Sequence, residues 1–473
     1  MDDMIWNSAW RTRENIVAGT VSAVETIETA LNRLAAVEPE LHAFRRICAD
    51  QARDAALKAD AMVRNGASLG PLHGVPVALK DEPWVSGMPA TGGSLLFEDF
   101  IPKEDGTLAA RLRAAGAIII GMTNVPEFYT WSRTANRLGP ETVNPWDTRR
   151  SPGASSGGTG AAIAAGVAPL GIGSDGGGSI RIPSAACGLV GLFPTPGRIP
   201  DTGSFSYARV GSMGPMARDV RDLAIAMDVL SGPDGRDPRP SPAPREYAAT
   251  LNDGIAGMRF LWSPDYGHID VDSAVAAQVG ATAARLAEAG ATVEAAPFSI
   301  DASWPWFIDY LRGEVIYGNV PSCFTNDPAF VARCLAPENF TRLAEYNQIG
   351  LTTPPPSQDA YEAAVSWVAE LGRKMDALFE TYDAILSPTL PVIAPILPDG
   401  LADPYPTFCC GTYYTAIANL LMLPALSFPA GLVDGMPVGL QIMGRHGRED
   451  QILRVARALE QIQPFTVHPA LSR

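Results

Sequence analysis

Lysine is scarce in this sequence. The chain has 473 residues, and only four of its 36 basic residues are lysine, so arginine supplies the other 32. Charged residues make up 18% of the chain, the formal net charge is −15, and there is no run of basic residues. This composition argues against a nucleic-acid partner, because binding to a phosphate backbone depends on clustered Lys and Arg.

Histidine and cysteine are also sparse, and neither shows a metal-binding spacing. The five histidines are scattered without a His-x-His or His-x-x-His pair, and the six cysteines lack the paired spacing of zinc sites. We therefore expect no metal and no other cofactor. The first residues do not resemble a signal peptide, so we expect reduced thiols and a cytoplasmic protein.

Long uninterrupted hydrophobic segments are missing as well. Residues 413–433 carry no charge, but Pro424, Pro429 and Gly431 interrupt them. This pattern favours a helix that leads into a buried strand over a membrane span. We expect a monomer or homodimer that binds a small molecule and no membrane.

In the rest of the sequence, helices that end at glycine alternate with buried apolar strands. Helices are expected at 106–115 and 157–165, each followed by an apolar strand, at 117–122 and 167–173. This alternation predicts an α/β sandwich with a largely buried sheet. We expect one domain over 1–473, with a catalytic core at about 65–220 and 376–473. The aromatic segment between them, about 225–375, is expected to be a variable, substrate-facing elaboration.

One glycine-rich segment raises a catalytic hypothesis. In GIGSDGGGSIRIPSAACG (171–188), three glycines stand directly before Ser179. Consecutive glycines can bring backbone N–H groups close to a ligand. Ser179 would then attack a carbonyl, while the amides of Gly176, Gly177, Gly178 and Ser179 form an oxyanion hole. The alternative is a glycine-rich turn with an incidental serine.

A second glycine–serine cluster, SPGASSGGTG (151–160), places Ser155 24 residues before Ser179. One short helix and one strand separate the two serines, so both can lie at the same edge of a sheet. The letters GASSG also match the nucleophile elbow of α/β-hydrolases, which would make Ser155 the nucleophile with a histidine base. That elbow follows a strand, whereas a loop is expected before Ser155.

Lys80 is the candidate base. It ends the apolar run HGVPVALK, expected to be a buried strand, while the other lysines lie in polar surroundings. A desolvated lysine can lose its proton, and an arginine cannot. The alternative is a lysine that reaches solvent from the end of a strand.

Three motifs in order, GVPVALKD, SPGASSGGTGAAIAAG and GSDGGGSIRIPSAACGLVGLFPT, resemble the amidase signature family of serine hydrolases. The 24-residue serine spacing matches, and further segments extend the resemblance over most of the chain. It implies an α/β/α sandwich with a large mixed sheet and a Ser–cis-Ser–Lys triad. In that triad Ser179 is the nucleophile, Ser155 is the bridging serine after a cis peptide bond, and Lys80 is the base.

The resemblance also implies an oxyanion hole on the amides of 176–179. It further implies supporting hydrogen bonds from Ser156, Asp175 and Arg181. Three positions depart from the usual pattern, although none removes a catalytic group: they are Ala154 in place of glycine, Ser174 in place of threonine, and Phe193 in place of a frequent lysine.

Substrate choice is less constrained. Family members cleave amides, anilides, fatty-acid amides, carbamates and lactam-derived oligomers, and one branch belongs to a tRNA-dependent amidotransferase complex. Aromatic residues suggest an apolar pocket wall: Phe205, Tyr207, Trp304, Trp306, Phe307, Phe408, Tyr413 and Tyr414. Our hypothesis is an amidohydrolase for hydrophobic or aryl amides. The alternatives are a urethanase for aryl carbamates and, less favoured by the acidic charge, a glutaminase-type amidotransferase subunit.

Overall fold

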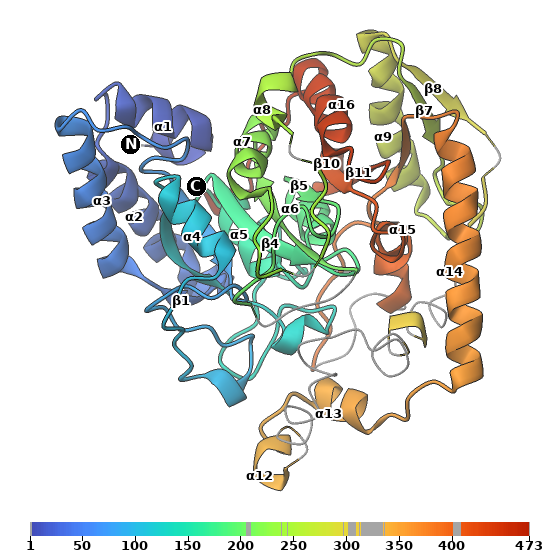
Figure 1. Ribbon diagram of the computed structural model, residues 1–473, viewed down its shortest axis with the longest axis horizontal. Helices are drawn as coiled ribbons and strands as arrows, with labels where there is room; N and C mark the ends of the chain where they lie inside the picture. The colour runs from blue at the N-terminus through green and yellow to red at the C-terminus, as the bar shows by residue number, and fades with distance from the viewer. Residues whose placement is uncertain are drawn as a thin grey trace.

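A mixed β-sheet of eleven strands runs through the described part of the molecule (Figure 1). The computed structural model describes residues 2–204, 210–237, 239–243, 245–296, 298–300, 309–311, 313, 334, 336–400 and 408–472. The strands are β1 (Phe44–Ile47), β2 (Pro76–Lys80), β3 (Ile118–Thr123), β4 (Leu170–Asp175), β5 (Val190–Phe193), β6 (Ser212–Ala217), β7 (Arg259–Trp262), β8 (Thr292–Ala295), β9 (Ala384–Pro388), β10 (Ala425–Val433) and β11 (Met436–Gly444).

The order of the strands across the sheet is β1-β3-β2-β4-β6-β5-β10-β11-β9-β7-β8. β2 pairs in parallel with both β3 and β4, whereas the strands from β4 through β6, β5, β10 and β11 to β9 pair antiparallel. β7 is parallel to its two neighbours. The large mixed sheet that the family resemblance implies is therefore confirmed.

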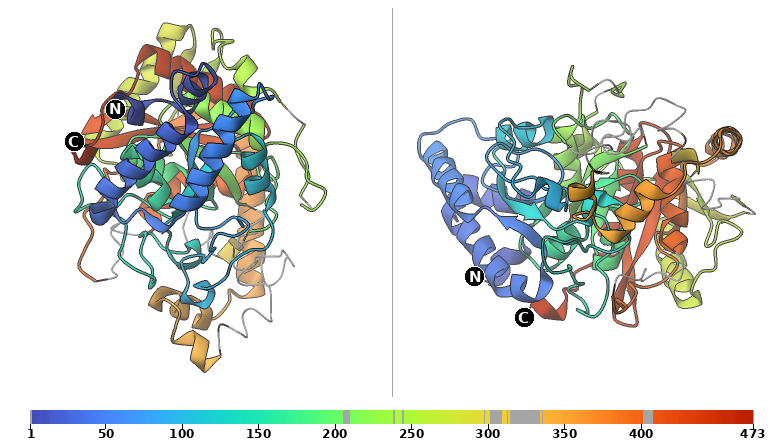
Figure 2. Two further views of the ribbon diagram at one scale, coloured as in Figure 1. Left: turned by 90° about the vertical axis from the view of Figure 1, so that its left-hand side faces the viewer. Right: turned by 90° about the horizontal axis from the view of Figure 1, so that it is seen from below.

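Helices cover both faces of this sheet (Figures 1 and 2). They are α1 (Ala9–Val17), α2 (Ala23–Leu41), α3 (Ala49–Arg64), α4 (Thr107–Ala114), α5 (Gly157–Ala164), α6 (Arg181–Cys187), α7 (Val220–Leu230), α8 (Tyr247–Thr250), α9 (Ser273–Ala284), α12 (Pro337–Phe340), α13 (Glu345–Thr352), α14 (Gln358–Phe379), α15 (Phe408–Leu420) and α16 (Glu449–Ile462). Short 3₁₀ turns add η1 (Asp2–Trp6), η2 (Leu95–Phe97), η3 (Glu127–Tyr129), η4 (Arg285–Ala289) and η5 (Ala470–Ser472).

The residues of β2 show how the layers form, because successive side chains of a strand point to opposite faces. Val77 and Leu79 belong to a hydrophobic cluster that includes residues of α4, α7, α9 and α16. Ala78, between them, belongs to a second cluster, which includes residues of α2, α3 and α5. Lys80 stands two positions after Ala78 and so shares the face that α5 covers. The sandwich places the lysine beside the helix that follows Ser155.

The elements expected from the sequence are present. The expected helix–strand pairs are α4 with β3 and α5 with β4, and residues 413–433 divide between α15 and β10. No helix in the described ranges is long and apolar enough to cross a membrane.

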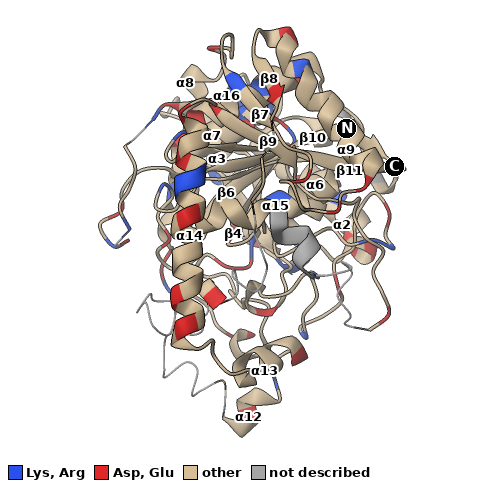
Figure 3. Cartoon of the chain, turned by 90° about the vertical axis from the view of Figure 1, so that its right-hand side faces the viewer, with Lys and Arg blue, Asp and Glu red and all other residues tan. Residues whose placement is uncertain are grey.

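The segment expected as an elaboration contributes to the sheet itself. Residues 259–262 and 292–295 form β7 and β8, which end the sheet on the side opposite β1. The long helix α14 runs along that side of the molecule (Figures 1 and 3). The domain limits drawn from the sequence stay a prediction, but part of 225–375 continues the central sheet.

Candidate active site

Lys80 is buried at the end of β2 with its side chain fully inaccessible to solvent. Its Nζ donates hydrogen bonds to Oγ of Ser155, at 2.8 Å, and to Oγ of Ser174, at 2.6 Å. Its amine also lies 4.6 Å from the ring centroid of Tyr129. Burial lowers the pKa of Lys80 below its ordinary value, and the carboxylates of Glu82 and Asp175 oppose that shift. The amine is thus held beside a serine hydroxyl in a setting that favours loss of its proton.

The loop before α5 presents Ser155 to this amine. The peptide bond between Ala154 and Ser155 is cis, as the resemblance implies. Gly153 has a φ of +82°, and a Cβ atom there would lie 2.9 Å from the backbone of Pro183. Only glycine easily adopts this positive φ and leaves no Cβ to collide with Pro183, which explains why the motif has a glycine two positions before Ser155.

Ser156 joins the two serine loops. Its backbone N–H donates to the carbonyl oxygen of Ser179 at 3.2 Å. Its hydroxyl donates to the carbonyl of Ser174 at 3.2 Å and lies 3.3 Å from the Ser174 amide, from which it accepts. These bonds join the loop of Ser179, which is partly exposed, to the loop of Ser155 although 24 residues separate the two serines.

A fully buried ion pair braces the loop that carries Ser179. Nε and Nη2 of Arg181 each donate to a carboxylate oxygen of Asp175 at 2.9 Å. Asn419 of α15 also contacts both partners. Burial raises the pKa of Asp175, but the guanidinium of Arg181, together with hydrogen bonds from Asn419 and the Ile180 amide, outweighs this and holds the pKa below its ordinary value. Asp175 therefore remains a carboxylate that can anchor backbone amides.

Asp175 takes one of the amides expected in the oxyanion hole. The N–H of Gly178 donates to Oδ1 of Asp175 at 2.7 Å. The amides of Gly176, Gly177 and Ser179 have no hydrogen-bond partner in the described part of the chain. A Cβ on Gly176 would meet nothing within 4 Å, whereas one on Gly178 would lie 2.3 Å from Oγ1 of Thr415. Gly178 shapes the loop, and the other three amides are available to a ligand.

Glu82 joins the cluster although no sequence motif points to it. Its side chain is fully buried, and Oε2 lies 3.3 Å from Nζ of Lys80 and accepts a hydrogen bond from the Ser174 hydroxyl. A signal was present, since an acidic residue two positions after a strand-end lysine tends to share its face. Tyr129 was also missed, and its position over Lys80 depends on a fold of η3 that sequence spacing does not reveal.

The structure explains two of the departures from the family pattern. The guanidinium of Arg181 lies 5.0 Å from the ring centroid of Phe193, which is fully buried. A lysine at that position would bring a second cation against Arg181, whereas the aromatic face attracts the guanidinium. At position 174 a serine supplies the hydroxyl that a threonine would, and Lys80 and Glu82 both use it.

The nucleophile-elbow alternative finds no support. The residues before Ser155 form a loop rather than a strand. Among the described residues, the Ser155 hydroxyl bonds to Lys80 and to no histidine.

The aromatic residues expected in a pocket wall lie largely outside the described residues or side chains. Phe205, Tyr207, Trp304, Trp306 and Phe307 are outside the described ranges, and the side chains of Phe408 and Tyr413 are not described. Tyr414 packs in the core, where its ring meets Tyr266 at 5.2 Å and its hydroxyl donates to the carbonyl of Pro264.

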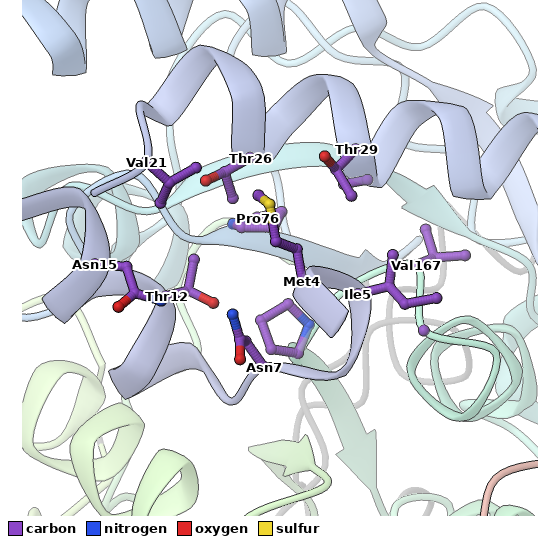
Figure 4. Close-up of a pocket in the computed structure, with 13 residues that line it drawn as sticks. Met4, Ile5, Asn7, Thr12, Asn15, Val21, Thr26, Thr29, Pro76 and Val167 are labelled. Atoms are coloured by element: carbon purple, nitrogen blue, oxygen red, sulfur yellow. The ribbon is translucent and has the colours of Figure 1, made fainter. Parts of the chain in front are cut away.

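Two cavities of the described structure differ in their relation to this cluster. A cavity of about 30 Å³ lies among η1, α1 and α2 (Figure 4), shares no residue with the cluster, and has room for about one water molecule. A pocket of about 320 Å³ is lined by residues 135–137, 343–346 and 348. The second pocket adjoins η3, because the hydroxyl of Tyr346 accepts a hydrogen bond from the backbone of Glu127.

Comparison with known proteins agrees with this geometry. A sequence model of the family described as "Amidase" matches residues 25–453. The A subunit of the glutamyl-tRNA(Gln) amidotransferase of Symbiobacterium thermophilum is 36% identical over 484 aligned positions, which cover 98% of this chain and 99% of that protein. Its counterpart in Chloroflexus aggregans is also 36% identical, and the match covers 97% of both chains.

Solved structures of amide-cleaving enzymes superpose over almost the whole chain. A bacterial aryl acylamidase of the amidase signature family has a TM-score of 0.84 at 26% identity and covers 99% of this chain and 98% of its own. A 6-aminohexanoate cyclic dimer hydrolase reaches 0.87 at 28% identity, and the peptide amidase of Stenotrophomonas maltophilia reaches 0.83 at 28%, each covering 99% of both chains. Fold and motifs together define an amide C–N hydrolase. The chain belongs to the amidase family and, within it, to the amidase signature enzymes.

Proposed function

We propose that this protein is an amidohydrolase that cleaves hydrophobic or aryl amides through an acyl-enzyme on Ser179. The observation that carries the proposal is the 2.8 Å hydrogen bond from Lys80 to Ser155, on a loop joined by hydrogen bonds to that of Ser179. Nucleophilic catalysis requires a base that can take the proton of the serine hydroxyl. In the described residues, Lys80 is the group whose burial and contacts fit that task.

The proposed reaction is an acyl transfer in two stages. Neutral Lys80 takes the Ser155 proton while Ser155 takes that of Ser179, and Oγ of Ser179 bonds to the carbonyl carbon. The amides of Gly176, Gly177 and Ser179 stabilise the negative oxygen that develops. The relay then gives the proton to the leaving nitrogen, and the C–N bond breaks. Water attacks the acyl-enzyme by the same relay and releases the acid.

An apolar wall beside the cluster supports a hydrophobic substrate. Phe128, next to Tyr129, packs in a hydrophobic cluster with Leu96 and Leu343. Glu127 attaches the 343–347 segment to this wall, because one of its carboxylate oxygens accepts hydrogen bonds from the Ala344 amide at 2.7 Å and from Asn347 at 2.8 Å. The ring of Tyr346 in turn stacks on Trp131 with centroids 5.0 Å apart. The residues that adjoin Tyr129 thus pack largely among aromatic and aliphatic side chains.

Aryl carbamates are the first alternative substrates, because they present a similar carbonyl and the same leaving amine. The discriminating experiment uses an acetanilide and a carbamate that both release 4-nitroaniline, assayed with the wild type and Ser179→Ala. We expect release by the wild type alone, faster from the anilide. Faster release from the carbamate would make the enzyme a urethanase. Release by Ser179→Ala at the wild-type rate would contradict the serine mechanism.

A second candidate is a glutamine-hydrolysing component of an amidotransferase, favoured by the 36% identity to two amidotransferase subunits over nearly their whole lengths. Such a component works in a complex and would hydrolyse glutamine rather than anilides. Ammonia release from glutamine, measured with the protein alone and after size exclusion with candidate partner chains, separates the two. Anilide turnover without glutamine hydrolysis favours the amidohydrolase.

A further inference from the structure

A carboxylate faces the proposed base in the interior of the protein. Glu82 and Lys80 are both fully buried, with Oε2 and Nζ 3.3 Å apart. The Ser174 hydroxyl bridges them, since it accepts a hydrogen bond from Nζ and donates one to Oε2. Oε1 of Glu82 is buried and has no hydrogen-bond partner among the described residues. Such a group is costly to bury unless a nearby positive charge compensates, and the Lys80 amine in contact with Glu82 provides that charge when it is protonated.

Lys80 has two sets of contacts. Its amine donates to Ser155, on the loop before α5, and it also contacts the Ser174–Glu82 pair. We propose that Glu82 is a positioning residue for Lys80: it directs the amine toward Ser155 and stabilises the ammonium that forms when Lys80 accepts the proton. This inference rests on the proposed function, since it takes Lys80 as the base of the reaction.

Other groups near the pair determine what a titration would report. Asp175 of β4 is close enough to raise the pKa of Lys80, and the Tyr129 ring of η3 lies over its amine. Glu82 also acts on Asp201: burial raises the pKa of Asp201 to about 7, an effect that Arg239 opposes and Glu82 increases. A test must therefore separate the charge of Glu82 from that of Asp201.

The sign of the effect follows from these contacts. The Glu82 carboxylate favours the charged form of Lys80 and so holds the pKa of the amine higher than burial alone would. In Glu82→Gln the pKa of Lys80 should fall by about 1–3 units, the range for an opposite charge in contact. The acid limb of kcat/KM should move to lower pH by the same amount, because Lys80 becomes neutral earlier. A merely structural role would lower the rate at every pH and leave the limb in place.

The scarcity of lysine makes a direct measurement possible. Labelling lysine with ¹³C at Cε gives four signals, and Lys80→Met identifies the one from Lys80. The pH titration of that signal is compared between the wild type, Glu82→Gln, Glu82→Asp and Asp201→Asn. We expect a large downward shift in Glu82→Gln, a smaller one in Glu82→Asp, and little change in Asp201→Asn. Should Glu82→Gln fail to fold, Glu82→Asp still decides the direction.

A matched control removes another buried carboxylate. Glu449 is fully buried and pairs with Arg198 at 2.9 Å, outside the serine–lysine cluster. Glu449→Gln should lower stability without moving either the Lys80 signal or the acid limb. An unchanged Lys80 pKa in Glu82→Gln would overturn the inference. A shifted Lys80 pKa with an unshifted acid limb would retain the pairing but overturn the assignment of Lys80 as base.

Discussion

The amine of Lys80 donates a 2.8 Å hydrogen bond to the hydroxyl of Ser155, which stands 75 positions further along the chain. Strand β2 carries the lysine, and the loop before α5 carries the serine. Both groups are buried, so little water competes for the bond. The proposed chemistry depends on this contact.

Removing the base should abolish most of the activity. Lys80→Met and Lys80→Arg should each lower kcat/KM by about 10²–10⁴-fold, the usual contribution of general acid–base catalysis. Arginine keeps the charge but cannot give up its proton. Lys374→Met is the matched control, because Lys374 is half exposed on α14 and pairs, among the described residues, with Glu370 one turn earlier. Wild-type rates in Lys80→Met, measured as 4-nitroaniline release, would disprove the assignment.

The rate should rise with pH. Burial lowers the pKa of Lys80 below its ordinary value of 10.5, and the amine acts as a base only when neutral. The logarithm of kcat/KM should therefore increase with pH and level off once Lys80 has lost its proton. The profile is measured over the pH range in which circular dichroism shows a folded protein. A rate that falls across that range would indicate that Lys80 acts as a cation instead.

Two neighbouring glycines should respond differently to alanine. Gly178 has a φ of +131° and no room for a Cβ beside Thr415, whereas Gly176 has open space around it. Gly178→Ala should displace the Ser179 loop and lower kcat by about 10²–10³-fold, the cost of losing an oxyanion-hole donor. Gly176→Ala should keep the wild-type melting temperature, which makes it the control for folding. Equal melting temperatures and equal kcat values in both variants would contradict this account of the loop.

Much of the sandwich could be predicted from sequence because its strands are short apolar runs next to helices that end at glycine. β3 and β4 follow that pattern, β2 is an apolar run without such a helix directly before it, and the motifs mark Lys80, Ser155 and Ser179. The residues of β7 (RFLW) are a similar apolar run. Because aromatic residues are frequent around them, the sequence favours a substrate-facing elaboration there over a strand of the central sheet. Strand β6 (SMGPMA), which lies between β4 and β5, has no such pattern and is identified only by its pairing.

The parts of the site that escaped prediction depend on contacts between distant segments. Glu82 gains its role from Ser174, 92 positions away, and Arg181 meets Asn419, 238 positions away. The amide of Gly178 differs from its neighbours only because the carboxylate of Asp175 turns back to accept from it. Spacing along a single sequence does not reveal such contacts, since they exist only once the chain has folded.

Position 193 offers a stability test. Phe193→Leu removes the aromatic face beneath Arg181 and should lower the free energy of unfolding by about 1–2 kcal/mol. Phe193→Lys should cost more, about 3–5 kcal/mol, because it buries a second cation without a free carboxylate. Urea denaturation of the two variants and the wild type gives the order of their free energies of unfolding. A Phe193→Lys protein as stable as the wild type would contradict the proposed role of the ring.

The most direct measurement is the site of acylation. The protein is mixed with a slowly hydrolysed aryl carbamate, quenched in acid and digested, and the modified peptide is sequenced by mass spectrometry. The account predicts one carbamoyl group on Ser179 in the wild type and none in Ser179→Ala. A label on Ser155, or an unchanged label in Ser179→Ala, would contradict the central claim that Ser179 is the nucleophile.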